Sequence, residues 1–346
     1  MIDALIIGDP GPFATIQDLG RHGYQRFGVP VSGAMDGRAL RLANRLVGND
    51  EAEAGIEFTL VGGRYEVAAE RCRIAVIGDF DLSIDGKPAA TCRAHDLERG
   101  ALVTIGGSPR WVRGYLAVAG GFDVPLVLGS RSTHTRSRLG GIDGQTLRAG
   151  QLLNLRAPAP SGSPCMLPSR SLMPDDRPIR VIFGPQQDHF SDRAAGQFLT
   201  NTYQVNPRSD RMGYRLDGPP IAPLGDYNIV SDGIAPGSVQ IAGNGRPILL
   251  LADRQSTGGY PKIATVISAD LPRLAQFRPG QEVRFIAVSL DQAAAIADQA
   301  RNAFNRLCDK IAPLPANRPG DAVPLGVNPI SGVAAGAAGD GDYDGE

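Results

Sequence analysis

The chain has 346 residues, of which 42% are hydrophobic and 21% charged, with a formal net charge of -1. This length favours two domains, and the balanced charge gives no indication of a nucleic-acid surface or a polybasic membrane contact. The first residues lack the pattern of a signal peptide, and no apolar stretch approaches membrane-spanning length, so we expect a cytoplasmic protein. The four cysteines form no Cys-x-x-Cys pair, and we expect free thiols.

Short apolar runs alternate with glycine and proline along most of the chain. The 44 glycines and 27 prolines are typical of β-rich sandwiches and barrels. The first helix is expected from about Asp36 to Val47, because Asp36 can cap its start and Gly48 can end it. Strands are expected at residues 65–68, 74–78, 81–84, 102–105 and 115–119.

A proline-rich segment divides the chain. Residues 157–178 contain six prolines and are predicted to link a first β domain, residues 1–156, to a second, residues 179–311. From residue 312 to 346 the chain is rich in Gly, Ala, Pro and acid, and we expect it to be disordered. In the second domain we expect a helix after Ser191, a helix over residues 291–310, and strands at 179–183, 228–230, 239–241, 248–251, 263–267 and 283–288.

The most polar connection in the chain joins the apolar runs 248–251 and 263–267. Residues 252–262 read ADRQSTGGYPK and combine an acid, two bases, an amide, hydroxyls and a Gly-Gly pair. Gly-Gly allows backbone N–H groups to approach a ligand closely, and Arg254 and Lys262 could add positive charge beside them. A hairpin turn with solvated polar residues is the alternative interpretation, and spacing alone does not separate the two.

Several familiar chemical signatures are absent. The chain has no G-x-x-x-x-G-K-[ST], G-x-S-x-G or H-E-x-x-H, which disfavours a P-loop ATPase, a serine hydrolase of that type and a zinc protease. The four histidines show no ligand spacing, and no metal site is expected. Other polar, glycine-containing segments lie at residues 15–24, 30–36, 184–190, 209–215 and 231–240.

The polar segments of the second domain could surround a site. Their bases could bind a carboxylate, a phosphate or a carboxylated intermediate, and Asp210, Asp232 and Asp253 could orient those bases or move protons. For any single Asp–Arg pair, a structural ion pair is the simpler interpretation. Because several such segments occur in one domain, at least one of them is expected to line a site.

At these residues the chain resembles the KipA/PxpC family, the biotin-dependent carboxyltransferase subunits of the allophanate hydrolase subunit 2 type. The resemblance extends from about residue 5 to about residue 290. It is carried by QDLGR at 17–21, GVPVSGAMD at 28–36, AN at 43–44, LVGN at 46–49, GPQ at 184–186, SDRMGYRL at 209–216, SDGI at 231–234, PGSVQ at 236–240 and DRQSTGGYPK at 253–262.

The resemblance implies a mainly β fold with a few helices, built as two cyclophilin-like β-barrel subdomains. It also implies a KipI/PxpB-type partner subunit, with the site near the junction of the two chains. In this family, 5-oxoprolinase assemblies use ATP to open 5-oxo-L-proline to L-glutamate with a third, PxpA-type subunit. Other members form the carboxyltransferase part of urea carboxylase, and a further member regulates a KipI-like kinase inhibitor by binding it.

We therefore expect a subunit of an ATP-dependent 5-oxoprolinase, with ATP used by the complex. Biotin is not expected on this chain, because none of its five methionines has a lysine beside it. Carboxyl transfer to urea or a related amide, and non-catalytic binding of a KipI-like protein, are the alternatives. The candidate catalytic residues are Asp210, Arg211, Arg215, Asp253, Arg254 and Lys262. The candidate ligand-binding residues are Gln186, Ser209, Ser231, Gln240, Gln255, Thr257, Gly258, Gly259 and Tyr260.

Overall fold

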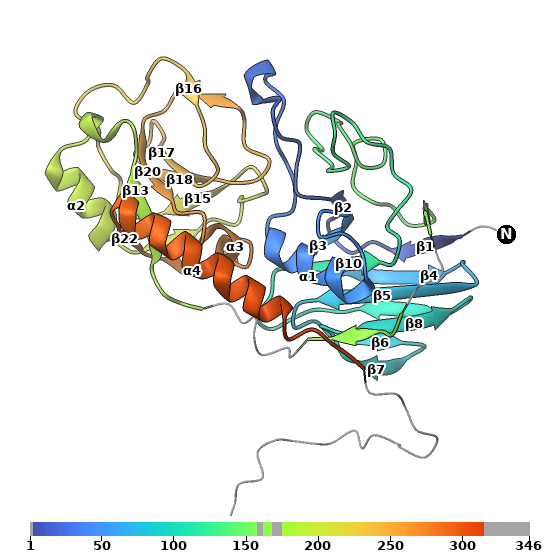
Figure 1. The fold of residues 1–346 in the computed structure, drawn as a ribbon. Coiled ribbons are helices and arrows are strands. Elements are labelled where there is room, and N and C mark those ends of the chain that lie inside the picture. The colour runs from blue at the N-terminus through green and yellow to red at the C-terminus, as the bar shows by residue number, and fades with distance from the viewer. Residues whose placement is uncertain (1–2, 158–161, 168–174, 315–346) are drawn as a thin grey trace, which may run out of the picture. The chain divides into compact units, whose positions relative to one another are not determined.

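Two hydrophobic cores organise the chain (Figure 1). The computed structural model describes residues 3–157, 162–167 and 175–314. The first core uses residues 5–167 together with Cys308, and the second uses residues 179–285 together with Met35. We call residues 3–167 the N-terminal half and residues 175–314 the C-terminal half. The domain boundaries expected from the sequence stay a prediction. Of the segment 312–346 that was expected to be disordered, residues 312–313 form a short strand, and residues from 315 onward lie outside the described residues.

The N-terminal half contains two antiparallel sheets. The first has the order β11-β1-β4-β9-β6-β7. Its strands are β1 (Ala4–Asp9), β4 (Gly63–Val67), β6 (Leu82–Ile84), β7 (Lys87–Ala89), β9 (Leu102–Ile105) and β11 (Leu152–Asn154). The second has the order β2-β3-β10-β5-β8. Its strands are β2 (Ala14–Gln17), β3 (Gly55–Thr59), β5 (Arg71–Ile77), β8 (Ala94–Glu98) and β10 (Arg113–Val118).

Helix α1 (Gly37–Val47) covers the second of these sheets. The Asp36 carboxylate accepts hydrogen bonds from the N–H groups of Arg38 and Ala39, and Gly48 ends the helix with φ 83°. This confirms the helix and both caps expected from the sequence. Because α1 packs on β10, all six residues of that strand are buried, whereas β4 alternates buried and exposed residues.

The C-terminal half is built on one eight-stranded sheet in the order β21-β14-β15-β18-β17-β20-β13-β22. The strands are β13 (Ile179–Phe183), β14 (Tyr203–Val205), β15 (Gly213–Asp217), β17 (Ser238–Ile241), β18 (Pro247–Leu250), β20 (Lys262–Val266), β21 (Glu282–Val283) and β22 (Phe285–Ala287). The two edge strands are consecutive in the chain. β21 pairs with β14 and β22 pairs with β13, so one short segment nearly closes the sheet into a barrel. The expected mainly β fold is thereby confirmed.

Three interpretations of the C-terminal half differ from the structure: the alternative hairpin and two of the expected strands. The runs at 248–251 and 263–267 do not form a hairpin, because β18 and β20 both pair with β17, which lies between them. The connection between them therefore crosses the end of β17. Residues 228–230 form no strand, because this segment is largely exposed and Val230 is 92% exposed. The strand expected over 283–288 is split between β21 and β22.

The remaining helices lie mainly in the C-terminal half. Ser191 caps α2 (Asp192–Thr200), and Ser289 with Gln292 forms a capping box on α4 (Leu290–Cys308), which confirms both expected helices. Helix α3 (Leu271–Leu274) was not expected. The end of α4 packs against the first core through Phe304, Leu307 and Cys308. None of the helices in the described residues has both the length and the apolar character needed to cross a bilayer.

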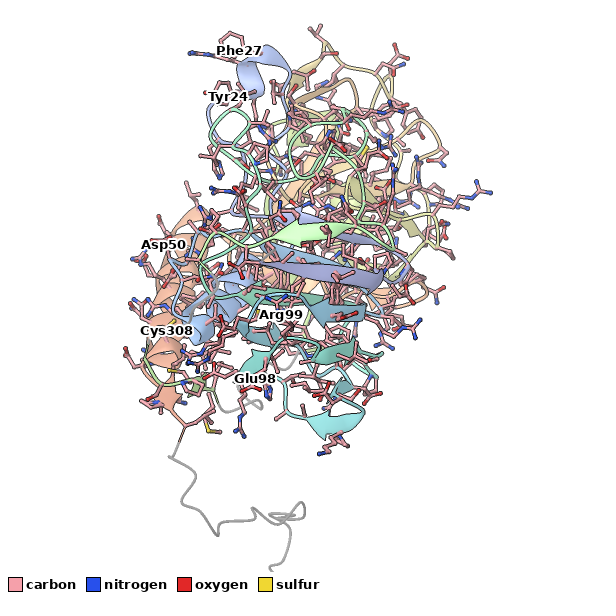
Figure 2. The ribbon with its side chains drawn as sticks, turned by 90° about the vertical axis from the view of Figure 1, so that its right-hand side faces the viewer. Tyr24, Phe27, Asp50, Glu98, Arg99 and Cys308 are labelled. Atoms are coloured by element: carbon pink, nitrogen blue, oxygen red, sulfur yellow. The ribbon has the colours of Figure 1, made fainter. Side chains whose placement is uncertain are left out.

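Short elements complete the fold. β12 (Cys165–Met166) pairs with β23 (Ala312–Pro313), and β16 (Asp232–Gly233) pairs with β19 (Thr257–Gly258). The described residues also include the 3-10 helices η1 (Gln25–Phe27) and η3 (Gln187–His189), which lie in loops. Figure 2 shows Tyr24 and Phe27 at the far end of the long loop between β2 and α1, with the Phe27 side chain 66% exposed.

Candidate functional site

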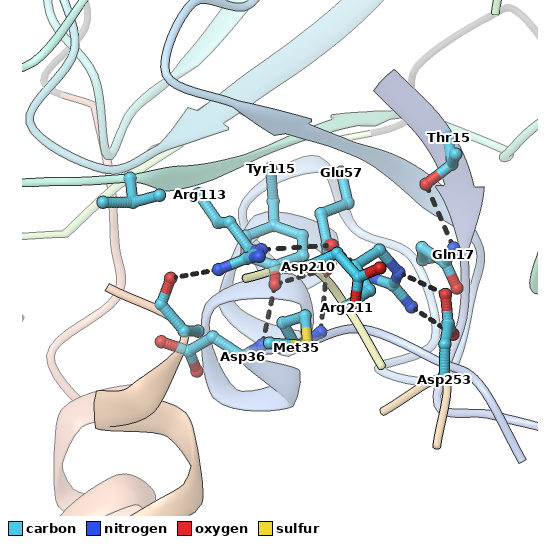
Figure 3. A network of polar contacts seen from close by, with 12 residues as sticks. Thr15, Gln17, Met35, Asp36, Glu57, Arg113, Tyr115, Asp210, Arg211 and Asp253 are labelled. Carbon is cyan, nitrogen blue, oxygen red and sulfur yellow. Dashed lines mark hydrogen bonds and ion pairs between the residues drawn. The ribbon is translucent and has the colours of Figure 1, made fainter. Parts of the chain in front are cut away.

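Arg211 and Asp253 lie in a buried ionic network between the two cores (Figure 3). Arg211 lies two residues before the start of β15, and its Nε and Nη2 donate to Asp253 Oδ2 and Oδ1 at 2.9 and 3.0 Å. Its Nη1 pairs with Glu57 of β3, and Nη2 also donates to the Gly33 carbonyl at 2.7 Å. All three guanidinium nitrogens thus donate to protein oxygens. Two of the accepting residues, Glu57 and Gly33, belong to the N-terminal half.

Glu57 and Tyr115 extend this network into the N-terminal half. Glu57 Oε2 accepts from the Met35 N–H at 2.8 Å and from the Tyr115 hydroxyl at 2.7 Å. The Tyr115 hydroxyl accepts in turn from the Asp36 N–H at 2.7 Å, so the network fixes the entry to α1. Neither Glu57 nor Tyr115 was expected from the sequence, since an isolated polar residue in a buried strand has no local pattern that marks it.

The charges in the network compensate one another. Burial opposes the charge on Arg211, but Asp253 and Glu57 raise its pKa above the ordinary arginine value. Arg113 of β10 forms a second polar link between the two halves. Its Nη1 donates to the Tyr214 hydroxyl at 2.7 Å and to the Ala275 carbonyl at 2.8 Å. The network therefore acts as a clamp between the two cores. The catalytic roles expected for Arg211 and Asp253 stay a prediction.

A second group of expected residues meets where β16 pairs with β19. Lys262 Nζ lies 2.6 Å from Asp232 Oδ2 and donates to the Gly233 carbonyl at 3.1 Å. Gln186 Nε2 donates to Asp232 Oδ2 at 3.1 Å, and Gln186 Oε1 accepts from the Lys262 N–H at 3.2 Å. The Lys262 side chain is 2% exposed and the Asp232 side chain is 52% exposed. The hydrogen bond from Lys262 lowers the pKa of Asp232 below its ordinary value.

Arg254 approaches the same segment from the other side. Its Nε donates to the Ile234 carbonyl at 3.1 Å, and its Nη1 donates to the Leu251 carbonyl at 3.3 Å. Arg254 is 4% exposed, yet no carboxylate of the described residues lies within ion-pairing distance of it. Burial without a counter-charge lowers the pKa of Arg254 to about 10. A bound anion would supply the missing charge.

Gln240 and Gly258 close this group. Gln240 Nε2 donates to the Tyr260 carbonyl at 3.2 Å. A Cβ at Gly258 would come within 2.7 Å of both Gln240 Nε2 and Ile234 Cδ1, so any larger residue would displace its neighbours. We call Gln186, Asp232, Gln240, Arg254 and Lys262 the loop cluster. The pairing of β16 with β19 holds its members together.

The other expected residues are more peripheral. Ser231, Gln255, Thr257 and Tyr260 are exposed on the loops around the cluster, and Gly259 accepts a hydrogen bond from the Ile229 N–H at 2.8 Å.

Ser209, Asp210 and Arg215 lie elsewhere. Ser209 Oγ accepts from the Arg215 N–H, and Asp210 accepts from the Met212 N–H and pairs with Arg136 at 3.1 Å. No hydrogen bond or ion pair within the described part of the chain joins these three side chains to the loop cluster. Their expected roles stay a prediction.

One further residue, His134, was not expected from the sequence. It comes from the N-terminal half and is buried, with Nε2 3.4 Å from the Asp253 carbonyl and Nδ1 accepting from the Ser137 N–H. It supports the backbone just before Arg254. Across the described residues, no group of three His, Cys, Asp or Glu side chains is placed to hold a metal ion.

Comparison with known proteins decides the family. Residues 27–287 match the carboxyltransferase domain, subdomain A and B. The chain belongs to this family. It is 35% identical to the C subunit of 5-oxoprolinase from Escherichia coli (strain K12), over 86% of this chain and 95% of that protein. It is 38% identical to the C subunit of 5-oxoprolinase from Haemophilus influenzae, over 86% of this chain and 94% of that protein.

A solved structure extends the likeness. This carboxyltransferase domain resembles the crystal structure of Kluyveromyces lactis urea carboxylase, with a TM-score of 0.82 and 30% sequence identity. The match covers 91% of this chain and 31% of the urea carboxylase chain. The resemblance drawn from the sequence motifs is therefore confirmed at the level of the family and its fold.

Proposed function

We propose that this carboxyltransferase domain is the C-type subunit of an ATP-dependent 5-oxoprolinase. It would open 5-oxo-L-proline to L-glutamate together with KipI/PxpB-type and PxpA-type subunits, with ATP consumed by the complex. The proposal rests on how much of each relative's own length aligns with this chain. The two 5-oxoprolinase relatives align over 95% and 94% of their own lengths, whereas only 31% of the urea carboxylase chain aligns.

The loop cluster has the chemistry that this substrate needs. 5-Oxoproline is a five-membered lactam that carries a carboxylate. Arg254, buried without a carboxylate partner, is suited to bind that carboxylate through its planar guanidinium. Its Nε and Nη1 are held by backbone carbonyls, so the cation is positioned before any ligand arrives.

Lys262 would act on the lactam itself. When water adds to the lactam carbonyl, negative charge develops on the oxygen before the C–N bond breaks, and a fixed cation nearby stabilises that charge. Lys262 directs two contacts to Asp232 and Gly233, which leaves one ammonium N–H for a ligand. The amides of Gln186 and Gln240 lie beside it and could hydrogen-bond the lactam N–H.

The test is reconstitution. The chain is co-purified with KipI/PxpB-type and PxpA-type subunits, and glutamate release from 5-oxoproline is measured with ATP. We expect turnover by the wild-type complex and a loss of about 100-fold for Arg254→Met, because a charge-assisted contact to the substrate carboxylate is removed. Arg193→Ala is the matched control, since Arg193 is exposed on α2 and forms no ion pair with any described residue. Absence of turnover in a well-folded wild-type complex would overturn the proposal.

Biotin-dependent carboxyl transfer to urea or a related amide is the second candidate. The family match and the likeness to urea carboxylase favour it. The loop cluster would suit it as well, because N-carboxybiotin also combines a carboxylate with a cyclic amide-like group. Because no biotin-accepting lysine stands beside a methionine in this chain, a biotinylated carrier must be added. Carboxylation of urea with that carrier, in preparations that do not open 5-oxoproline, would select this candidate.

A further inference from the structure

A cleft of about 660 Å³ lies between the start of α1, helix α3 and the side of α4. Figure 1 shows α4 extending from the C-terminal half to the neighbourhood of α1. None of the residues expected at the site lines this cleft. Its volume is typical of small-molecule sites. Ile296, Ala300 and Phe304 give it an apolar wall along α4.

The charged part of the lining, which includes the end of α4, is mainly basic. Six basic side chains line the cleft against three acidic ones, an excess of three formal positive charges. They are Arg38, Arg177, Arg180, Arg273, Arg306 and Lys310, against Asp36, Asp175 and Asp270. Asp270 receives Arg180 in a bidentate pair at 2.6 and 3.0 Å and also pairs with Arg273 at 3.3 Å. Asp175 pairs with Arg177 at 2.6 Å and with Arg273 at 2.5 Å. The positive charges of Arg38, Arg306 and Lys310 are left over.

Several donors in the cleft lack a carboxylate partner. Arg306 and Lys310, near the end of α4, form no ion pair with any residue that the structure describes. The closest carboxylate to Arg38 is that of Asp36 at 3.9 Å, which already caps α1. Arg273 is 7% exposed and pairs with Asp175 and Asp270, but its buried Nε donates to no atom of the described residues. An unpaired donor on a buried arginine is costly unless a ligand satisfies it.

We propose that this cleft binds a small molecule with a clustered anionic group, phosphate or polycarboxylate, and an apolar part that packs on α4. Guanidinium groups match both oxyanions with two parallel hydrogen bonds, and the apolar wall favours an organic body over an inorganic ion. Arg38 and Trp111 come from the N-terminal half and Arg273 from the C-terminal half, so the ligand would contact both. This site is separate from the loop cluster and does not depend on the function proposed for it.

Calorimetric titration of the full chain at low ionic strength tests the proposal. ADP and citrate are the probes for the two anionic chemistries, and adenosine is the uncharged comparison. We expect ADP or citrate to bind with Kd below about 1 mM, and adenosine to bind at least tenfold more weakly. Binding should weaken as salt is added, because Arg306 and Lys310 are exposed.

Two variants locate the binding. Arg306→Ala combined with Lys310→Ala should weaken it at least tenfold, and Ala300→Glu should abolish it by placing a carboxylate on the apolar wall. Arg301→Ala is the control, because Arg301 is on the same helix, pairs with Asp298 at 2.8 Å and does not line the cleft. Circular dichroism confirms that each variant is folded. The proposal fails if neither anion binds, or if both variants bind as tightly as the wild type.

Discussion

Two arginines of the C-terminal half, Arg211 and Arg254, are equally buried and differ in what surrounds them. Arg211 is 5% exposed and is held by Asp253 and Glu57, which raise its pKa. Arg254 is 4% exposed, its hydrogen bonds within the described residues go to backbone carbonyls, and burial lowers its pKa to about 10. The two arginines therefore differ in whether a carboxylate neutralises their charge, and not in how exposed they are. Arg211 is paired and joins the two cores, whereas Arg254 is unpaired within the described residues and is suited to bind a ligand.

This difference has opposite consequences for stability. Removing a compensated buried cation leaves its partner carboxylates buried and unpaired, which is strongly destabilising. Removing an uncompensated cation takes away a desolvated charge together with a few hydrogen bonds, and these effects oppose each other. The comparison can therefore be tested by measuring free energies of unfolding and activity in the same variants.

The largest effect is expected for Arg211→Met. It leaves Asp253 and Glu57 without their shared cation, and we expect the free energy of unfolding to fall by about 3–5 kcal/mol. Urea denaturation followed by circular dichroism gives the value. A loss under about 1 kcal/mol would show that the clamp contributes little to stability, and would contradict the proposed difference between Arg211 and Arg254.

A smaller loss is expected for Glu57→Gln. The amide oxygen can still accept from the Met35 N–H and the Tyr115 hydroxyl, but the charge opposite Arg211 is lost. We expect the free energy of unfolding to fall by about 2–3 kcal/mol. Glu66→Gln, on an exposed position of β4, is the matched control. Equal effects of the two changes would contradict a special role for Glu57.

For Arg254→Met we expect a change in unfolding free energy within about 1 kcal/mol, because relief of desolvation offsets the two lost hydrogen bonds. The same variant is expected to lose 5-oxoprolinase turnover. Denaturation and activity are measured on one preparation. Destabilisation as large as that of Arg211→Met would mean that Arg254 is structural after all.

Asp270 is a buried charge that is paired, like Arg211, and its contribution to stability can be tested by changing the pH. Burial opposes its ionisation, but hydrogen bonds from Arg180 lower its pKa below the ordinary value of 3.8. Ionised Asp270 therefore contributes stability above pH 3.8, and this contribution is lost as pH falls through the lower folded-state pKa. We expect Asp270→Asn to flatten the acid limb of the stability curve below about pH 4. An unchanged acid limb would contradict the assignment.

The smallest effect is expected for Asp232→Asn. Asp232 itself is half-exposed, so water and salt screen its pairing with the buried Lys262, and the melting temperature should fall only slightly. Differential scanning calorimetry at two salt concentrations measures this. A marked fall in melting temperature would place Asp232 with the clamp and not with the loop cluster.

Local signals in the sequence were sufficient for α1, α2 and α4, although not for the short helix α3. Asp36, Ser191 and Ser289 accept N–H groups of the turn that follows each of them, so a short stretch of sequence holds the whole cause. The same holds for strands such as β9 and β13, whose bounds agree with those expected. Lys262, Arg254 and Gln186 could also be named, because each stands in an unusually polar, glycine-containing loop.

The pairings between distant segments could not be predicted. The placement of β17 between β18 and β20 depends on hydrogen bonds across the sheet, and no local pattern distinguishes it from a hairpin. Glu57 lies 154 positions from Arg211, so their contact exists only in the folded chain. The same reason explains why the sequence could not show that Arg211 is paired and Arg254 is not.

The way in which β21 and β22 occupy the two edges of the eight-stranded sheet limits how another protein can attach to the C-terminal half. A common way to add a partner is to extend an exposed sheet edge with a further strand. Here one segment, residues 282–287, occupies both ends of the eight-stranded sheet, and each edge strand is only two or three residues long. A chain that docks on this barrel must therefore recognise its loops and side chains, so such an interface would be sensitive to single surface substitutions.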